Sequence, residues 1–452
     1  MRVHTKQFSM LFITMLLMVA LSSCKYLDDK GGRSMAEFQV TIENTGEVYP
    51  ILKSGAFTTP LGASEPGPLM PGEAYEVEFT APVGAHLSLA TMFAQSNDWF
   101  FASDEDGIAL YHENGDQVTG DVTAQIDLYD AGTEEDQEVG VGNNQAPRQS
   151  GPDTGPDDPN PNVRLVDDMY LPANEEMIRV TLTSTGTNGF RLRIENSSDA
   201  NTLQTSEGSK PALLSPGTWL VHTAEQSGLL YTLGEPDYGD GLEAIAEDGA
   251  AGMLAEHLAA ETGLTVPLSP GAYAAYSGQN PIFQSGEPAP DNGIEALAED
   301  GAIDMLVTAL EAEAAVSASG GFNQPVGASQ PGPLLPGHQY QFTFEAEQGD
   351  RFTFATMYVQ SNDLFYAPVE DGIRLFENGS PITGDITDQV RLWDAGTEAN
   401  EEPGVGGNQP LRQSGPDTGP ADDNSNVREV NDMYDYGEVT DHIRVTIQMV
   451  GN

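Results

Sequence analysis

The chain has 452 residues and is strongly acidic, with 70 Asp and Glu against 18 Lys and Arg and a formal net charge of −52. Nucleic acid binding needs clustered Lys and Arg, so this balance excludes nucleic acid as a partner. It also disfavours docking on anionic lipid surfaces. Two uses remain for so many acids, the chelation of divalent cations and solubility in a salty medium that screens self-repulsion.

The first residues have the pattern of a secretion signal. A short basic stretch precedes a nearly continuous apolar run over 10–21, which is too short for a permanent membrane span. The tetrapeptide LSSC that ends at Cys24 resembles the lipobox of bacterial lipoproteins, whose cysteine is lipidated and becomes the first mature residue. We therefore expect a lipoprotein signal peptide over 1–23, lipidation of Cys24 and a polar tether over 24–35. An ordinary signal peptide that contains a cysteine is the alternative.

Cleavage after residue 23 would remove Arg2 and Lys6 and no acid, changing the formal charge from −52 to −54. Because Cys24 is the only cysteine, its lipidation leaves no disulfide to stabilise the fold. Packing or metal must do so instead. Lys25 follows the cysteine where an aspartate would favour retention in the inner membrane. The expected location is thus the cell envelope, lipid-anchored at the outer membrane or cell surface.

Short runs of alternating apolar and polar residues then follow, as is typical of half-buried β-strands. FQVTIEN at 38–44 and MIRVTL at 177–182 bracket a first set of such runs. FRLRIEN at 190–196 and HIRVTI at 442–447 bracket a second set. Turns rich in Gly, Asn and Pro separate the strands within each set, which indicates antiparallel β-sandwiches.

The two sets predict a mainly β protein with two tandem antiparallel β-sandwich domains, over 36–185 and 188–450. The second set also contains a smaller repeat, in which LSPGTWLVHT and LSPGAYAAYS each precede a stretch of helical composition and spacing. We expect these stretches to form two short helix pairs in an insert over about 205–320 of the second domain. The first domain is expected to lack this insert.

One acidic, glycine-rich segment occurs twice in the sequence, once in each predicted domain. Asp98 of the first copy corresponds to Asp363 of the second, and Asp130 corresponds to Asp394. Because neighbouring residues have drifted between the copies, the retained polar residues are the best candidates for chemistry. The aromatic residues that follow Asp98 are expected in the core rather than on an exposed platform.

The motifs of this segment resemble the spondin N-terminal domain family. They are ATM(F/Y)-x-Q-S-N-D, then D-A-G-T-E, then G-x-G-x-N-Q with R-Q-S-G-P-D-T-G-P. The resemblance implies a β-sandwich like that of C2 domains, a calcium site, and a role with extracellular matrix or in adhesion. It implies calcium ligands at three acids in each copy, although the third is typically Asp in animal members. These residues are Asp98, Asp130 and Glu134, and Asp363, Asp394 and Glu398.

The residues themselves agree with this implication. The turn from Asp130 to Glu134 contains a glycine that lets the chain fold back, bringing two carboxylates toward one point. Calcium takes six to eight oxygen ligands from such groups. The alternative is that Asp130 and Asp394 are Asx-turn residues that bond their own backbone. Asp153 and Asp417, in the proline-rich loops, are expected to be capping or surface groups.

Catalytic patterns are hard to assemble from this chain. No histidine recurs at equivalent positions of the two copies, and no G-x-S-x-G, H-E-x-x-H or Walker motif is present. Zinc is disfavoured for lack of a Cys and His cluster. We expect a calcium-binding cell-surface protein, not an enzyme, that acts in adhesion or binds an extracellular polymer or surface protein. The alternatives are a carbohydrate-processing enzyme that uses the acidic site and a purely structural outer-membrane lipoprotein.

Overall fold

A computed structural model describes residues 27–28, 34–168 and 170–451 of the protein. The predicted signal peptide over 1–23, the lipidation of Cys24 and most of the tether over 24–35 lie outside these residues and stay predictions. No helix of the described part has the length and apolar character needed to cross a membrane.

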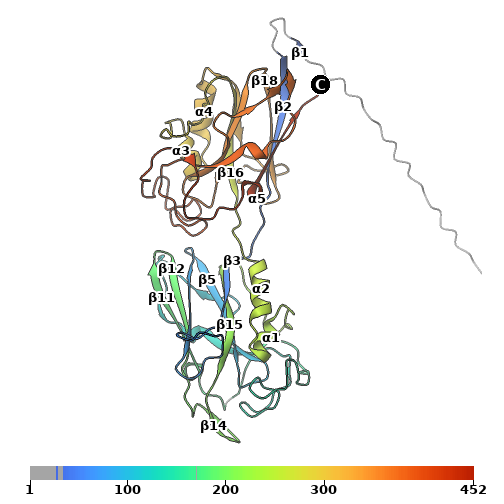
Figure 1. Ribbon diagram of the computed structural model, residues 1–452, viewed down its shortest axis with the longest axis vertical. Coiled ribbons are helices and arrows are strands. Elements are labelled where there is room, and N and C mark those ends of the chain that lie inside the picture. Colours follow the sequence, from blue (N-terminus) through green and yellow to red (C-terminus); the bar gives the residue numbers. More distant parts are fainter. Residues whose placement is uncertain (1–26, 29–33, 169, 452) are drawn as a thin grey trace, which may run out of the picture.

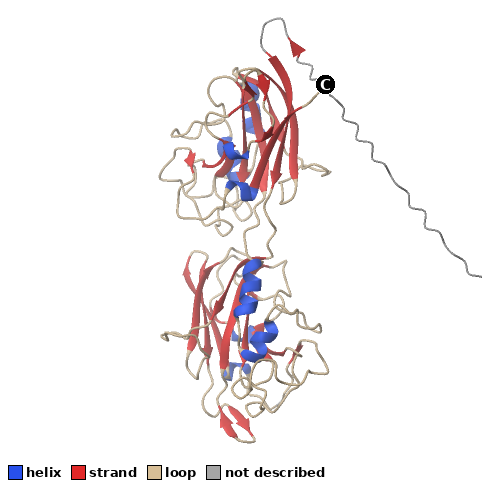
Figure 2. Ribbon diagram, turned by 45° about the vertical axis from the view of Figure 1, so that its right-hand side comes forward, coloured by secondary structure: helices blue, strands red, loops and turns tan. Residues whose placement is uncertain are grey.

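The protein is mainly β, with antiparallel sheets as predicted, and its strands divide between two packed units (Figure 1, Figure 2). The inserted unit runs without interruption from strand β3 to helix α2. The split unit combines strand β2, near the N-terminus, with everything from strand β16 to the C-terminal strand β27. Each unit pairs a seven-stranded sheet with a smaller one, of four strands in the inserted unit and five in the split unit, the arrangement of a β-sandwich.

In the inserted unit the larger sheet has the strand order β10-β9-β6-β5-β15-β3, with β7 beside β5, and the smaller sheet has the order β4-β12-β11-β8. A β13-β14 hairpin stands apart. The elements are β3 (Ile51–Phe57), β4 (Ala74–Thr80), β5 (Ala85–Phe93), β6 (Trp99–Ser103), β7 (Ile108–Ala109), β8 (Gly120–Asp121), β9 (Ile126–Asp130), β10 (Arg164–Leu165), β11 (Ile178–Gly186), β12 (Gly189–Asn196), β13 (Leu203–Thr205), β14 (Gly208–Lys210), β15 (Leu214–Thr223), α1 (Leu242–Asp248), α2 (Gly252–Ala260) and the 3-10 turns η1 (Thr123–Gln125) and η2 (Asn174–Glu176).

In the split unit the larger sheet has the order β17-β16-β19-β20-β25-β26, with β21 beside β19, and the smaller sheet has the order β18-β2-β27-β24, with β1 also on β2. The elements are β1 (Leu27–Asp28), β2 (Ser34–Asn44), β16 (Leu268–Tyr276), α3 (Ile294–Asp300), α4 (Asp304–Ala312), β17 (Val316–Phe322), β18 (Gln339–Glu347), β19 (Arg351–Tyr358), β20 (Leu364–Pro368), β21 (Ile373–Arg374), β22 (Phe376–Glu377), β23 (Ser380–Pro381), β24 (Gly384–Asp385), η3 (Thr387–Gln389), β25 (Val390–Asp394), β26 (Arg428–Glu429), α5 (Val439–His442) and β27 (Ile443–Met449).

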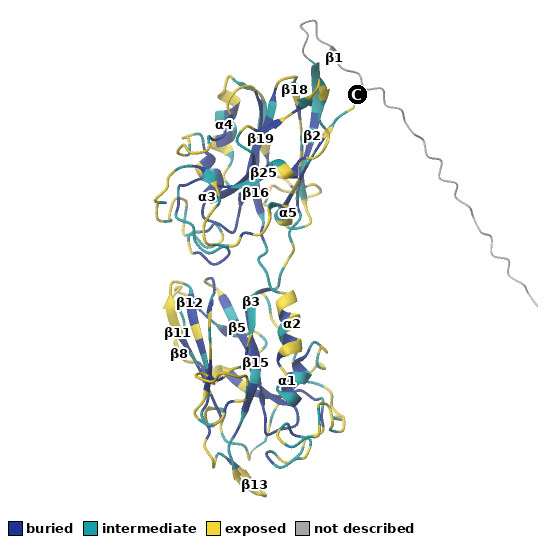
Figure 3. Cartoon of the chain, viewed as in Figure 1, coloured by how far each residue is buried: buried dark blue, intermediate teal, exposed yellow. Residues whose placement is uncertain are grey.

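Each unit has two apolar cores, one between its sheets and one beneath its helix pair (Figure 3). Alternation along β12 sends Phe190, Leu192 and Ile194 into the core between the sheets, as predicted from the sequence. On the outer face of the larger sheet, Phe100 packs with Leu242 and Ile245 of α1. The aromatic residues after Asp98 are therefore core residues, as expected.

The prediction that the strand at 38–44 opens the first sandwich is wrong. That strand lies in β2, which pairs with β18 and β27 of the split unit, and Val40 stands opposite Phe342 and Ile447. The strand at 190–196, expected to open the second sandwich, instead completes the inserted unit between β4 and β11. The boundaries 36–185 and 188–450 therefore do not separate the two packed units.

A tight hairpin explains this pairing. The segment 184–189, expected to join two domains, is the turn between β11 and β12, where Gly186 pairs with Gly189. Asn188 takes the left-handed conformation there, with φ of 58°. The loop is only two residues long, and so short a loop costs little closure entropy. β12 therefore forms locally, which leaves β2 to the split unit.

The expected helical insert over 205–320 is also divided between the units. Helices α1 and α2 contact β5 and β3 of the inserted unit, whereas α3 and α4 contact β19 and β17 of the split unit. The expectation that the first sandwich lacks a helix pair is therefore wrong. Each unit has one LSPG strand, β15 or β16, and one helix pair that covers the same face of its larger sheet.

The two units thus have the same strand arrangement but different chain connections. The chain leaves the split unit after β2, builds the whole inserted unit, and returns at β16. In the inserted unit the corresponding connection, from β12 to β15, is only the β13-β14 hairpin. The inserted unit is a circular permutant of the split unit, placed within one of its loops. Termini that lie close together make such insertions tolerable.

Candidate metal centre

Asp98 lies in the turn between β5 and β6. The preceding Ser96 shapes this turn, because its Oγ donates to the Phe93 carbonyl at 2.6 Å and accepts from the Trp99 amide at 3.0 Å. Asp98 is fully buried, and its Oδ2 accepts the amides of Thr133 and Glu134 at 2.7 and 3.1 Å. Among the residues that the structure describes, none donates a hydrogen bond to its Oδ1. A buried carboxylate oxygen without a donor is costly, so this atom favours coordination of a cation.

Asp130 ends β9 and is also buried. Its Oδ1 accepts the amide of Gly132 at 2.7 Å, so the Asx-turn interpretation is correct for this oxygen. Gly132 has φ of 73°, and a Cβ there would lie 2.7 Å from the Pro161 carbonyl carbon, so only glycine suits the turn. The Oδ2 of Asp130 pairs with Arg164, which also bonds Asp158 at 2.6 Å.

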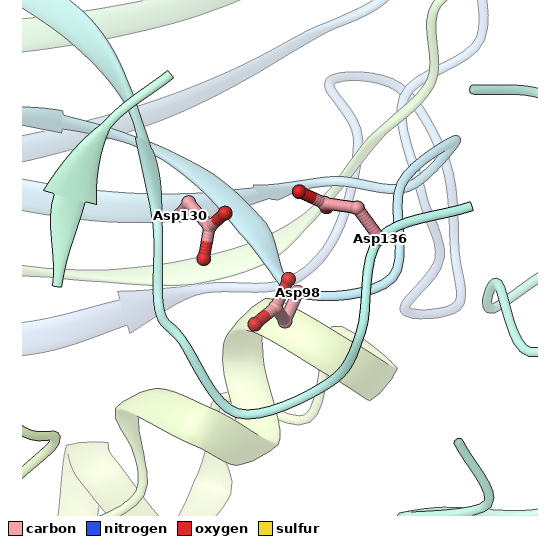
Figure 4. Close-up of side chains that lie close together, drawn as sticks. All are labelled: Asp98, Asp130 and Asp136. Carbon is pink, nitrogen blue, oxygen red and sulfur yellow. The ribbon is translucent and has the colours of Figure 1, made fainter. Parts of the chain in front are cut away.

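The third acid at this point is Asp136, which the sequence did not predict. Asp98, Asp130 and Asp136 each place one carboxylate oxygen within 4.8 Å of the other two (Figure 4). They come from the turn before β6, the end of β9 and the loop that follows it. The three acids are close enough to hold a metal ion, and carboxylate oxygens alone suit a hard divalent cation.

Glu134, the predicted third ligand, has a different environment. Its Oε1 accepts the amide of Gly155 at 2.5 Å, and its Oε2 accepts Asn97 Nδ2 at 3.1 Å. Its carboxylate groups instead with Asp153 and Glu247. The added methylene relative to Asp carries this carboxylate to the proline-rich loop, where it fixes the backbone at Gly155.

The split unit repeats this geometry. Oδ2 of buried Asp363 accepts the amides of Thr397 and Glu398 at 2.8 and 3.1 Å, and its Oδ1 has no partner. Asp394 accepts the Gly396 amide at 2.7 Å and pairs with Arg428 at 2.6 Å.

Two features complete the comparison with the inserted unit. Asn400 stands where Asp136 would be and donates to Asp394 Oδ2 at 2.8 Å. Glu398 accepts the Gly419 amide at 2.6 Å, as Glu134 does that of Gly155. The sequence therefore identified the aspartate pair of both units correctly as neighbours and misplaced the glutamate in both.

Electrostatics disfavours the ionised aspartates in the absence of a cation. Burial raises the pKa of Asp98 to about 6, although the amides of Glu134 and Thr133 oppose the shift. Burial and then the charges of Asp98 and Asp136 raise the pKa of Asp130, against the opposing charge of Arg164. Burial, followed by the charge of Asp394, raises the pKa of Asp363. A bound dication would relieve these costs at neutral pH.

A hollow of about 640 Å³ adjoins two of the three acids of the inserted unit, Asp130 and Asp136. Asp130, Asp136 and Arg164 lie on its wall, and Leu203 to Thr205 of β13 close its far side. Because the β13-β14 hairpin belongs to the inserted unit, this wall has no direct counterpart in the split unit, whose chain crosses to the other unit there. The hollow gives a candidate cation access to a larger ligand.

The chain matches no known family model, and a comparison with curated proteins finds no match. What the site can do chemically therefore follows from its residues.

Proposed function

We propose that this protein is a lipid-anchored surface protein whose two β-sandwich units each bind calcium and support contact with an extracellular polymer. The main observation in favour of calcium binding is a pair of buried oxygens without hydrogen-bond partners among the described residues, Asp98 Oδ1 and Asp363 Oδ1. Each lies in a fully buried side chain beside a second aspartate. Since buried charges are retained when they are paired or coordinate a metal, both atoms favour a cation.

Asp98, Asp130 and Asp136 would hold the ion in the inserted unit, and Asp363 and Asp394 would hold it in the split unit. Calcium is preferred over zinc because the donors are oxygens only. The spondin-like motifs of the sequence, which imply a calcium site and a role in adhesion, point the same way. When bound, calcium supplies positive charge and open coordination positions that hydroxyl or carboxylate groups of a polymer can fill.

The anchoring half of the proposal depends on Cys24 and its lipobox. Metabolic labelling with a fatty-acid analogue should mark the protein, and Cys24→Ala should lose the mark. A lipid anchor would hold both units outside the membrane, where the hollow beside Asp136 is open to polymer. An equally labelled Cys24→Ala protein would contradict lipid anchoring at Cys24, but it would not bear on the proposed cation sites.

The decisive experiment replaces Asp98 and Asp363 by Asn together. In each, the amide oxygen can still accept the backbone amides now held by Oδ2, while an NH₂ group replaces the unpartnered oxygen. Calorimetric titration should show calcium affinity at these sites reduced by on the order of 100-fold, comparable to the loss of a buried charge–ion contact. The matched control is Asp104→Asn with Asp388→Asn, two exposed acids outside the clusters. Equal affinities in the two double variants would contradict the proposal.

Whether calcium serves ligand binding or only stability is a separate question. Chelation should release the protein from extracellular polymer isolated from the producing cells while its far-UV circular dichroism remains that of a folded β protein. A chelated protein that stays bound, with only a lowered melting temperature, would assign calcium a structural role alone.

A further inference from the structure

A second group of carboxylates lies on the helix-covered side of each unit, apart from the aspartate pairs. Helix α3 of the split unit carries Glu295 and Glu299, four residues apart and so on one helix face. Asp417 of the proline-rich loop approaches them, and the three acids each place one oxygen within 4.8 Å of the others. Like charges at this spacing repel, and although Glu295 and Asp417 are exposed, Glu299 is buried, so a positive charge between them would be favourable.

The inserted unit has an equivalent group. Glu247 of α1 corresponds to Glu299, Asp153 corresponds to Asp417, and both lie with Glu134 within the same 4.8 Å limit. The duplication therefore kept this cluster as it kept the aspartate pair, although α1 and α3 come from separate copies of the helical segment. One difference is that Glu134 takes the place that Glu295 has in the split unit.

Burial makes the glutamates unlike surface acids. Glu247 and Glu299 are each 2% exposed. Within the described part of the chain, Oε1 of Glu299 has no hydrogen-bond partner, and it is shielded from solvent. An ionised, unpartnered carboxylate oxygen at this depth is expensive unless a cation neutralises it. This atom is the observation that distinguishes the cluster from an ordinary acidic surface.

The surroundings also favour a cation over a basic side chain. In the inserted unit a cavity of about 220 Å³ opens beside Glu247. The described residues of its wall include no Lys, Arg or His. They include five acids, Asp153, Asp237, Glu243, Glu247 and Asp248. Oδ1 of Asp237 is likewise buried and without a partner. The space can admit a hydrated ion, whose water ligands would complete the coordination shell.

We propose that each unit binds a second hard divalent cation, of the calcium class, between its first helix and its proline-rich loop. Glu299, Glu295 and Asp417 hold it in the split unit, and Glu247, Glu134 and Asp153 hold it in the inserted unit. The ion ties the helix pair to the loop that also carries the glycine bound by Glu134 or Glu398. This inference does not depend on the aspartate sites, which use other oxygens.

The test measures how much calcium the full chain binds, by equilibrium dialysis at about 0.15 M salt, where surface charges are screened beyond about 8 Å. The background is Asp98→Asn with Asp363→Asn, which weakens the aspartate sites by on the order of 100-fold, and calcium is held below the concentration at which those weakened sites fill. This background should retain about two equivalents of calcium, one for each oxygen-lined cluster. Adding Glu247→Gln and Glu299→Gln should remove both of these calcium equivalents. The matched control instead adds Glu256→Gln and Glu311→Gln, which change exposed acids on the helices.

A second variant guards against misfolding of the buried substitutions. Asp153 and Asp417 have φ of 49° and 51°, a left-handed conformation that Asn adopts as readily as Asp. Asp153→Asn with Asp417→Asn therefore keeps the backbone and should weaken binding roughly tenfold for each lost ligand charge.

The inference is overturned if both substitution pairs bind calcium as the Glu256→Gln and Glu311→Gln control does. The background variant could instead bind as much calcium as the unaltered chain, with binding reduced only by Glu247→Gln and Glu299→Gln. That result would support the second site and contradict the aspartate sites. If the background binds none, the inference is wrong and the aspartate sites remain.

Discussion

The inserted and split units place equivalent strands in equivalent sheet positions, but the chain reaches them by different routes. In the inserted unit a two-residue turn and a short hairpin connect β11, β12 and β15. In the split unit β2 takes the position of β12, although more than 200 residues separate it from β16. The comparison teaches that β12 pairs with β11, its neighbour in sequence, because the loop between them is short. β2 then pairs with β18 and β27, which are distant in sequence.

The candidate metal centres differ by one charge. Asp98, Asp130 and Asp136 face Arg164 in the inserted unit, whereas in the split unit Asn400 occupies the position of Asp136. Three carboxylates and one guanidinium leave a formal charge of about −2, against about −1 in the split unit. Because ligand charge tunes calcium affinity, the two centres should not bind equally.

The largest effect should come from cutting the chain at the boundaries suggested by sequence. A fragment of residues 36–185 lacks β15, the strand between β3 and β5, and lacks β12 between β4 and β11. β2 can replace β12 by its similar pattern, but nothing in the fragment replaces β15, so both edges of the gap stay unpaired. We expect no cooperative unfolding transition from 36–185 and a cooperative one from 47–264. Scanning calorimetry of both fragments tests this expectation. Cooperative unfolding of 36–185 would contradict the permuted arrangement.

Two asparagines offer a finer test of which strand belongs to which unit. Asn44 Nδ2, at the end of β2, donates to the carbonyls of Val266 and Leu334 at 2.9 and 2.8 Å. Asn196 Nδ2, at the end of β12, donates to Leu69 and Ala212, both at 2.9 Å. Substitution by Ala removes two buried hydrogen bonds in each case, although Leu334 and Ala212 keep a second donor, and should cost roughly 1–3 kcal/mol.

The location of that loss is the informative result. Hydrogen exchange in the full chain should show Asn44→Ala weakening protection of the split unit and Asn196→Ala weakening that of the inserted unit. The reverse assignment is what a simple tandem of 36–185 and 188–450 predicts. Observing it would overturn the strand exchange.

The sequence identified strands with clear alternation but did not predict others, among them β3, β15, β16 and β17, and it did not identify strand partners. Alternating residues at 38–44 and 190–196 do form strands, yet periodicity says nothing of which neighbour a strand pairs with. Two signals were present. The Asn188-Gly189 dipeptide between alternating runs is a hairpin signal, and the LSPG-helix segment occurs twice in succession, one for each unit. Partner choice depends on long-range packing, which the sequence pattern does not encode.

At the metal centre, comparison of the two copies was both the strength and the limit of the sequence argument. It found Asp98 and Asp130 because Asp363 and Asp394 repeat them. It could also have found Arg164, which Arg428 repeats. It could not find Asp136, because Asn400 breaks the match. Glu134 is also retained, yet it bonds the Gly155 amide and lies with Glu247 and Asp153, so retention alone does not show to which cluster a carboxylate belongs.

The charge difference between the centres can be exchanged. Asp136→Asn should lower the calcium affinity of the inserted unit, and Asn400→Asp should raise that of the split unit, each roughly tenfold. The estimate follows from a unit charge and a dication about 5 Å apart in water, which interact by about 1.7 kcal/mol. Calorimetric titration of the full chain, with the other unit's aspartate replaced by Asn, isolates each site. Equal affinities before and after both exchanges would show that the residue at this position does not face the ion.

The smallest expected effect concerns a histidine present in one unit only. His222 in β15 is fully buried, with Nε2 3.0 Å from Ser88 Oγ and Nδ1 2.9 Å from the Thr223 carbonyl oxygen. The ring of His86 lies 5.9 Å away. In the split unit these two positions hold Tyr276 and Arg351, and the tyrosine hydroxyl donates to the Asp371 carbonyl at 3.0 Å.

Burial, assisted by His86, lowers the pKa of His222 below 6.5, although the Thr223 carbonyl and the charge of Asp106 oppose the shift. The unfolded chain therefore takes up this proton more readily than the folded one, so the stability that neutral His222 contributes is complete above pH 6.5 and is lost as the pH falls toward the folded pKa. The buried carboxylates shift the opposite way in both units, and Asp136, whose counterpart is Asn400, does so in the inserted unit only. With Asp136→Asn as the background, hydrogen exchange between pH 7.5 and 5 should show the inserted unit losing protection relative to the split unit. His222→Tyr, which installs the residue of the split unit, should remove the difference, and a variant that keeps the same pH dependence would place its origin elsewhere in the inserted unit.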